Sequence, residues 1–113
     1  MNLKISNYHK KQYDKIYRST ELFLKFIETH EKLNNKVILD AGCGAGANTI
    51  YLAQRFPKSF IIGVDQNNAA INFARFMTKS KKIDNCKFFN FNILNFNKKI
   101  KIDIILSFHF LSF

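Results

Sequence analysis

An acidic residue followed by three glycines on alternate positions is the part of this sequence best suited to binding a small ligand. Asp40 ends the apolar run 37–39, and Gly42, Gly44 and Gly46 follow it. Glycines between a strand and a helix let a ligand approach the backbone closely, because no Cβ intervenes. The free N–H groups at the start of the next helix point into the same turn. The pattern therefore predicts a small polar ligand at the carboxyl end of a buried strand.

Strands and helices that alternate along the chain must position these residues. Strands are predicted at four apolar runs, residues 37–40, 60–65, 87–92 and 102–108. Helices are predicted at residues 48–55, ended by Pro57, and from an Asn67 cap to about Ser80. The second and fourth runs are apolar on both faces, as parallel strands covered on two sides are. This alternation predicts an α/β fold with a parallel sheet.

The N-terminal segment reads as a helical cover. Residues 7–33 place apolar side chains at three-and-four spacing, which is typical of a helix. Ser19 or Thr20 is a candidate cap for its second part. Asn34 and Asn35 form a turn before the first strand. We therefore expect two parts, a helical cover at residues 1–35 and a sheet domain at residues 36–113.

Composition indicates a folded domain and leaves one class of partner open. The 113 residues are 47% hydrophobic and include 13 Phe, enough to fill a core. The net charge of +10 can indicate nucleic acid or an anionic membrane as a partner. Apart from residues 79–82 and 98–101 the lysines are scattered, and abundant Asn, Ile and Phe accompany them. An AT-rich genome would encode the same set, so a nucleic-acid partner is neither indicated nor excluded.

The cysteines and the apolar stretches indicate a reduced, cytoplasmic protein. Cys43 and Cys86 are the only cysteines, and they predict neither a disulfide framework nor a metal site. Cys43 lies between two glycines, where a small side chain fits, and we interpret it as steric rather than reactive. The basic N-terminus lacks the apolar segment of a signal peptide. The longest apolar stretches are far below the roughly 20 residues that span a bilayer, so no membrane partner is expected.

Two motifs together resemble those of the class I S-adenosylmethionine-dependent methyltransferases. Asp40 and the three glycines match the first motif of that family, D/E-x-G-x-G-x-G, and residues 61–65, Ile-Ile-Gly-Val-Asp, match the second. The resemblance runs from about Lys36 to the end of the chain. It implies a three-layer Rossmann-like fold with strand order 3-2-1-4-5-7-6, of which residues 36–113 would supply strands 3-2-1-4. It also implies S-adenosylmethionine as cofactor and a methyl acceptor, expected to be a small molecule.

The resemblance also implies a role for each residue near the glycines. Asp40 would lie near the ammonium group of the methionine tail, or would fix the turn by accepting backbone N–H groups. Asp65 would accept both ribose hydroxyls, one on each oxygen, while an asparagine caps the next helix. Gln66 would lie against the adenine. The residues expected to bind the cofactor are Asp40, Gly42, Cys43, Gly44, Gly46, Asp65, Gln66, Asn92 and Ile93.

The last two of these residues follow the third strand, and no catalytic residue is identified. Asn92 stands where the family commonly has Asp. Its side-chain amide can accept a hydrogen bond from the adenine amino group and donate one to a ring nitrogen. Alternatively, Asn92 is an ordinary turn residue after a strand. Ile93 would pack on the adenine face. Residues 107–110 lack the D/N-P-P-Y/F signature of amino-group methylation. Because the methyl donor is already activated, transfer needs alignment more than an acid or base.

Three further expectations concern the fourth strand and the alternative functions. In the family this strand lies in the middle of the sheet, so here it would have an exposed apolar edge. Such an edge predicts that the chain is a fragment, that a second chain completes its sheet, or that it associates with itself. A non-catalytic remnant, or one subunit of a split enzyme, is therefore an alternative. A nicotinamide-binding oxidoreductase is another, because Gly42-x-Gly44-x-x-Ala47 satisfies the dinucleotide fingerprint. Asp40 and Gly46 favour the methyltransferase.

Overall fold

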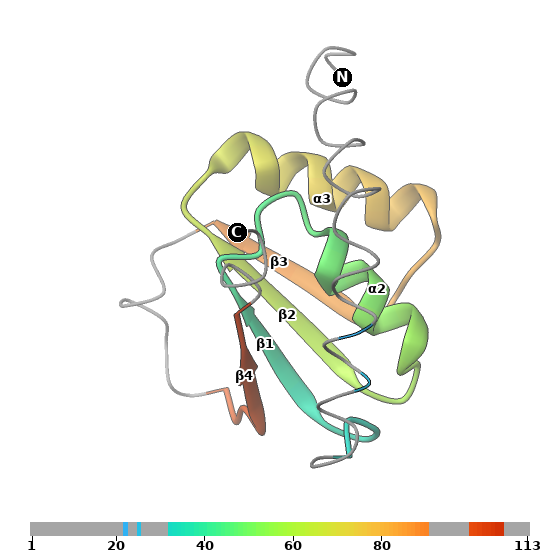
Figure 1. Ribbon diagram of the computed structural model, residues 1–113. Coiled ribbons are helices and arrows are strands. Elements are labelled where there is room, and N and C mark those ends of the chain that lie inside the picture. The colour runs from blue at the N-terminus through green and yellow to red at the C-terminus, as the bar shows by residue number, and fades with distance from the viewer. Residues whose placement is uncertain (1–21, 23–24, 26–31, 91–99, 108–113) are drawn as a thin grey trace.

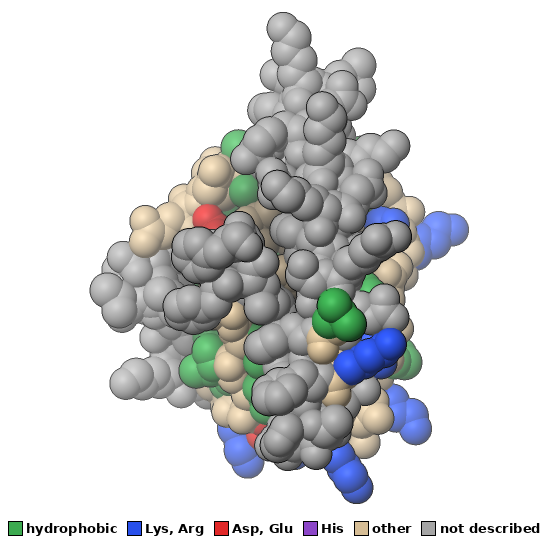
Figure 2. All heavy atoms as spheres, viewed as in Figure 1, with side chains coloured by type: hydrophobic (Ala, Val, Ile, Leu, Met, Phe, Trp, Pro, Cys, Tyr) green, Lys and Arg blue, Asp and Glu red, His purple; other side chains and the backbone are tan. Residues whose placement is uncertain are grey.

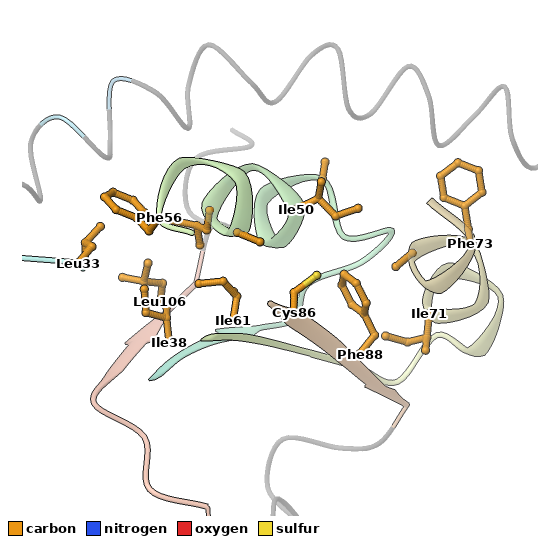
Figure 3. Packing of buried hydrophobic residues seen from close by; sticks show 14 residues of the cluster. Leu33, Ile38, Ile50, Phe56, Ile61, Ile71, Phe73, Cys86, Phe88 and Leu106 are labelled. Atoms are coloured by element: carbon orange, nitrogen blue, oxygen red, sulfur yellow. The ribbon is translucent and has the colours of Figure 1, made fainter. Parts of the chain in front are cut away.

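The computed structural model describes residues 22, 25, 32–90 and 100–107, and within them the chain forms one parallel sheet. The strand order is β3-β2-β1-β4, which confirms the predicted order and the α/β class. Two helices lie together on one face of this sheet (Figures 1 and 3). The elements are β1 Val37–Ala41, α2 Ala47–Arg55, β2 Phe60–Asp65, α3 Asn68–Ser80, β3 Cys86–Asn90 and β4 Ile104–Leu106.

Two strand boundaries differ from the prediction. β3 begins one residue earlier than expected, at Cys86, and its described part ends at Asn90. β4 begins at Ile104 rather than at residue 102. The reason lies in Asp103, whose backbone N–H donates to Val37 O at 2.9 Å while its carboxylate accepts the Val37 N–H at 2.8 Å. The Asp103 side chain therefore accepts the N–H bond that a backbone carbonyl of the strand would otherwise accept, which gives Asp103 a structural role.

Both faces of the two central strands, β1 and β2, are buried, which explains their unbroken apolar runs. Ile38 and Ile61 point toward the helices and belong to the larger core, shown in Figure 3. Leu39, Ile62 and Val64 form a second buried cluster. Because successive side chains of a strand point to opposite faces, β1 and β2 contribute to both clusters. The fourth strand was expected to be covered on both faces, but β4 contributes only to the larger core, and its outward side chain, Ile105, is exposed.

The two helices bury the faces that their sequences predicted. In α2, Ile50, Leu52 and Ala53 are buried. α3 begins after Asn67, whose side-chain oxygen accepts the Ala70 N–H at 3.1 Å, so the predicted cap is confirmed. On α3, Ala70, Ile71 and Ala74 are buried, and Met77 is half-buried. Both helices are therefore fixed against the sheet at the ends that face the glycine turn.

Asn85 holds the far end of α2 in place. Its side-chain NH₂ group donates to Ala53 O at 2.9 Å, to Phe56 O at 3.2 Å and to Ser59 O at 2.9 Å. The last carbonyl groups of a helix have no partner within the helix. One amide from the start of β3 thus satisfies carbonyl groups of α2 and of the loop that leads into β2.

Replacing Asn85 by alanine is expected to lower the free energy of unfolding by about 2 kcal/mol, because part-buried carbonyl groups lose their donors. Urea denaturation measures the change. Asn72→Ala is the matched control, since Asn72 is exposed on α3, and it should alter stability by less than about 0.5 kcal/mol. Equal effects of the two substitutions would show that Asn85 does not hold α2.

Several expectations fall at the edges of the described residues. The helix predicted at residues 7–33 lies outside them for the most part; Leu22 and Lys25 are helical, and Leu33 is buried in the core. The predicted turn at Asn34 and Asn35 is confirmed. The division at residues 35 and 36 stays a prediction. On β4 the side chain of Ile105 is 66% exposed, and pairing of this edge with another chain also stays a prediction.

On the face shown in Figure 2, the Lys and Arg side chains of the described residues form no single patch. There, Lys and Arg side chains lie spread along the margin rather than gathered over one element. A nucleic-acid partner therefore stays a prediction without a defined surface. None of the described helices combines the length and the apolar character needed to cross a membrane.

Candidate functional site

The glycine turn folds back over the end of β2. Gly42, Gly44 and Gly46 all have positive φ, at 70°, 54° and 86°, a region that other residues rarely adopt. The N–H groups of Gly42 and Cys43 both donate to Val64 O at 2.9 Å. Gly46 is the residue immediately before α2 and has no side-chain cap. These two backbone bonds tie the start of the turn to β2, and the turn leads directly into a helix N-terminus.

The glycines serve two different purposes. A Cβ on Gly44 would meet no atom within 4 Å, so the space beside it is open. A Cβ on Gly46 would lie 2.7 Å from the ring of Phe88 and 2.8 Å from Ala74 Cβ. A Cβ on Gly63 of β2 would also lie 2.7 Å from that ring. The ring of Phe88 thus fills the space that two glycines leave, and Gly46 is required for packing, whereas Gly44 leaves room for a ligand.

Asp40 lies beneath the turn rather than on its surface. Its side chain is 1% exposed, and Oδ2 accepts a hydrogen bond from the Thr49 hydroxyl at 2.7 Å. The donor that the structure shows for Asp40 is therefore a side-chain hydroxyl of α2, not the backbone N–H groups of the turn that the sequence led us to expect. Burial raises the pKa of Asp40 from 3.8 to about 7; the Thr49 bond opposes this rise and the charge of Asp65 adds to it. Asp40 therefore titrates near neutral pH.

Asp65 joins the turn to the start of α3. Its Oδ2 accepts the Gly44 N–H at 2.9 Å, and its Oδ1 accepts the Asn67 N–H at 2.8 Å. Each carboxylate oxygen can accept a second hydrogen bond. The geometry therefore leaves Asp65 able to accept two hydroxyl groups beside the open space at Gly44. Gln66, the next residue, is exposed.

Asn90 is a site residue that the sequence reasoning missed. It pairs with Asp65 in the sheet register, and its side-chain NH₂ donates to Asp65 O at 3.1 Å and to Gln66 O at 2.9 Å. Asparagine at alternate positions 90 and 92 was the available signal, because both side chains of such a pair point to one side of a strand. Asn92 and Ile93 themselves lie outside the described residues, so their contacts stay predictions.

Cys43 fits the steric interpretation. Its Sγ lies 3.0 Å from the position that a Cβ on Gly63 would take. Burial raises the pKa of the Cys43 thiol above its ordinary value, and the charges of Asp40 and Asp65 add to the rise. The thiolate is the nucleophilic form of cysteine. A neutral, packed thiol is therefore what the site contains at this position.

The described site combines two acidic groups with backbone N–H donors. Asp40 and Asp65 lie close enough for the charge of one to act on the other. The N-terminus of α2 opens onto the same turn, and free helix N–H groups favour a carboxylate or another anionic group. A ligand that carries both a cation and an anion, together with vicinal hydroxyls, matches this set of groups.

The sequence model of a family described as "Methyltransferase domain" matches residues 32–112. The chain belongs to this methyltransferase family. The matched span contains every residue predicted to bind the cofactor. The family membership and the strand order agree with the resemblance that the two motifs carried.

Individual relatives support the same family. The methyltransferase domain is 34% identical over 74 residues to trans-aconitate 2-methyltransferase of Escherichia coli, a match that covers 66% of this chain and 27% of that protein. It is 28% identical to the plantazolicin methyltransferase BpumL in complex with SAH, with a TM-score of 0.68, over 92% of this chain and 40% of that one. It is 31% identical to PKMT2 of Rickettsia typhi in complex with AdoHcy, with a TM-score of 0.62, over 68% of this chain and 15% of that one. The chain therefore spans well under half the length of these relatives.

Proposed function

We propose that this methyltransferase domain binds S-adenosylmethionine at the glycine turn and forms the cofactor-binding part of a methyltransferase. The observation that carries the proposal is the carboxylate of Asp65, which two backbone N–H groups hold beside the open space at Gly44. Two solved relatives, at 28% and 31% identity, are complexes with SAH and AdoHcy. Those molecules are the demethylated form of the same cofactor.

Each residue at or near the glycine turn contacts a different part of the cofactor in this proposal. Asp65 accepts the two ribose hydroxyls, and the N-terminus of α2 receives the carboxylate of the methionine tail. Asp40 supplies negative charge beneath the tail's ammonium group. When bound, the cofactor itself supplies the activated methyl group, so the residues of this chain hold and orient it and exclude water.

The acceptor pocket is proposed to come from outside the sheet described above. The chain spans 27% of the Escherichia coli relative and 40% of BpumL. We therefore regard it as the cofactor-binding fragment of a larger unit, with a small molecule as the proposed acceptor. We place this unit in the cytoplasm, where thiols stay reduced, because Cys43 and Cys86 are both free.

Replacing Asp65 by alanine is expected to weaken the binding of S-adenosylhomocysteine by more than about tenfold, or about 1.4 kcal/mol. Two hydrogen bonds to the ribose are lost, and the Gly44 N–H loses its acceptor. Calorimetric titration of wild type and variant measures the difference.

Asp84→Ala is the matched control, because Asp84 is an exposed acid that precedes β3 at the opposite end of the sheet from Asp65. It removes the same charge and should leave affinity within about twofold. Asp65→Asn keeps one oxygen acceptor and should give an intermediate loss. Unchanged affinity in Asp65→Ala would remove the support for the ribose assignment.

A further inference from the structure

Asp40 and Thr49 form a buried pair under the glycine turn. Thr49 lies in the first turn of α2 and is fully buried, and its hydroxyl donates to Asp40 Oδ2 at 2.7 Å. A buried carboxylate is costly unless donors or a cation stabilise it. Whether Asp40 is charged therefore depends on Thr49 and on what else surrounds the pair.

No cationic side chain is among the described groups that shift the pKa of Asp40, and the N-terminus of α2 supplies a partial positive charge alone. In the sheet, Asp40 stands opposite Gly63 of β2 and Leu106 of β4, neither of which is charged. Asp65 adds negative charge from the end of β2. The Cys43 thiol of the turn stays neutral, because burial and both carboxylates raise its pKa. With an Asp40 pKa of about 7, this carboxyl group is partly protonated near neutral pH, and a cation at the turn would favour its charged form.

We propose that Thr49 is a positioning residue that stabilises the charged form of Asp40, so that the domain releases a proton when a cationic group binds at the glycine turn. The proton passes from the Asp40 carboxyl group to solvent, and the carboxylate that remains faces the cation. The inference rests on the proposed function, in which the cation is the ammonium group of the methionine tail.

On this proposal, the Thr49 hydroxyl affects ligand affinity only at those pH values at which Asp40 must lose a proton for the ligand to bind. Below about pH 7 the free domain holds Asp40 protonated, so binding must create the carboxylate that Thr49 stabilises. At higher pH the carboxylate and its bond from Thr49 exist before the ligand arrives and persist afterwards. Loss of the hydroxyl should therefore weaken binding at low pH and leave it nearly unchanged at high pH. A purely structural Thr49 would weaken binding equally at both.

Calorimetric titration of the full chain with S-adenosylhomocysteine at about pH 6 and about pH 8.5 tests this pattern. Thr49→Val should weaken binding about tenfold at the lower pH and less than about twofold at the higher pH, because a hydrogen bond to a charged group shifts a pKa by about one unit. Thr49→Ser restores the hydroxyl and should keep the wild-type profile. Thr78→Val is the matched control, since the Thr78 hydroxyl donates to Ala74 O within α3, and it should change neither value.

Proton release is measured directly on the wild-type chain, which keeps the proposal testable if Thr49→Val does not fold. Titrations in two buffers of different ionisation enthalpy at about pH 6.5 should show about 0.8 proton released. The ligand's own amino group is that of a free amino acid, which is more basic than a peptide N-terminus, so it stays protonated at this pH and adds nothing to the release. Asp40→Asn should release none.

Two results would overturn the inference. One is equal weakening by Thr49→Val at both pH values, and the other is binding by wild type without proton release. A wild-type chain that binds no S-adenosylhomocysteine at either pH would instead overturn the proposed function, and this inference with it.

Discussion

Gly46→Ala is expected to lower the free energy of unfolding by about 3 kcal/mol, although it adds a single methyl group. The new Cβ would lie 2.7 Å from the ring of Phe88 and 2.8 Å from Ala74 Cβ, inside the packed core. The backbone there has a φ of 86°, which also strains any residue with a Cβ. Because domains are stable by only about 5–15 kcal/mol, the loss should shift the urea midpoint strongly.

Gly44→Ala separates the two causes of this loss. Its φ of 54° imposes a similar backbone strain, but no atom lies within 4 Å of the new Cβ. We expect a loss of about 1 kcal/mol. In a Phe88→Leu background, where the ring is absent, the further cost of Gly46→Ala should shrink but stay above that value, because the contact with Ala74 Cβ remains. Equal costs for the two glycines in the wild-type background would contradict the account of Phe88 packing.

The stability of the chain is expected to fall as pH rises from about 4 to about 7, through the titration of Asp40. In the unfolded chain Asp40 ionises near 3.8, whereas in the folded domain burial raises its pKa to about 7. Between these values the folded state binds one proton more, so stability falls with rising pH and becomes level above about 7. A shift of this size corresponds to about 4 kcal/mol.

Asp40→Asn isolates this effect, because the amide has nearly the same shape and does not titrate. Urea denaturation of both proteins at about pH 4 and about pH 8 should show the stability of the variant, relative to wild type, rising by about 4 kcal/mol across that range. Other titrating groups change both proteins alike and cancel in the difference. A difference that stays constant with pH would mean that folding does not shift the pKa of Asp40.

The arrangement of the elements could be predicted from local patterns in the sequence. Apolar runs gave the four strands, and the cap at Asn67 fixed the start of α3. The two motif acids, Asp40 and Asp65, come at or next to the carboxyl ends of neighbouring parallel strands, so their meeting at one site follows from the topology. These features depend on residues close together in the chain.

The contacts that complete the site join distant residues, and no local pattern announces them. Phe88 fills the space beside Gly46 and Gly63, which lie 42 and 25 positions earlier in the chain. Asn85 satisfies carbonyl groups of another element. Such contacts depend on how the helices pack on the sheet. The Asp40–Thr49 bond is shorter in range, but a threonine that opens a helix is too common to indicate it.

The most direct test of the central claim is calorimetric titration of the wild-type chain with S-adenosylhomocysteine, with NADH as the comparison ligand. The account predicts saturable binding of S-adenosylhomocysteine alone, because the turn joins a ribose-binding carboxylate at Asp65 to a buried acid at Asp40. Binding of NADH in its place would contradict the assignment and favour a dinucleotide site. Binding of neither ligand by the folded chain would contradict the claim that these strands hold a working cofactor site.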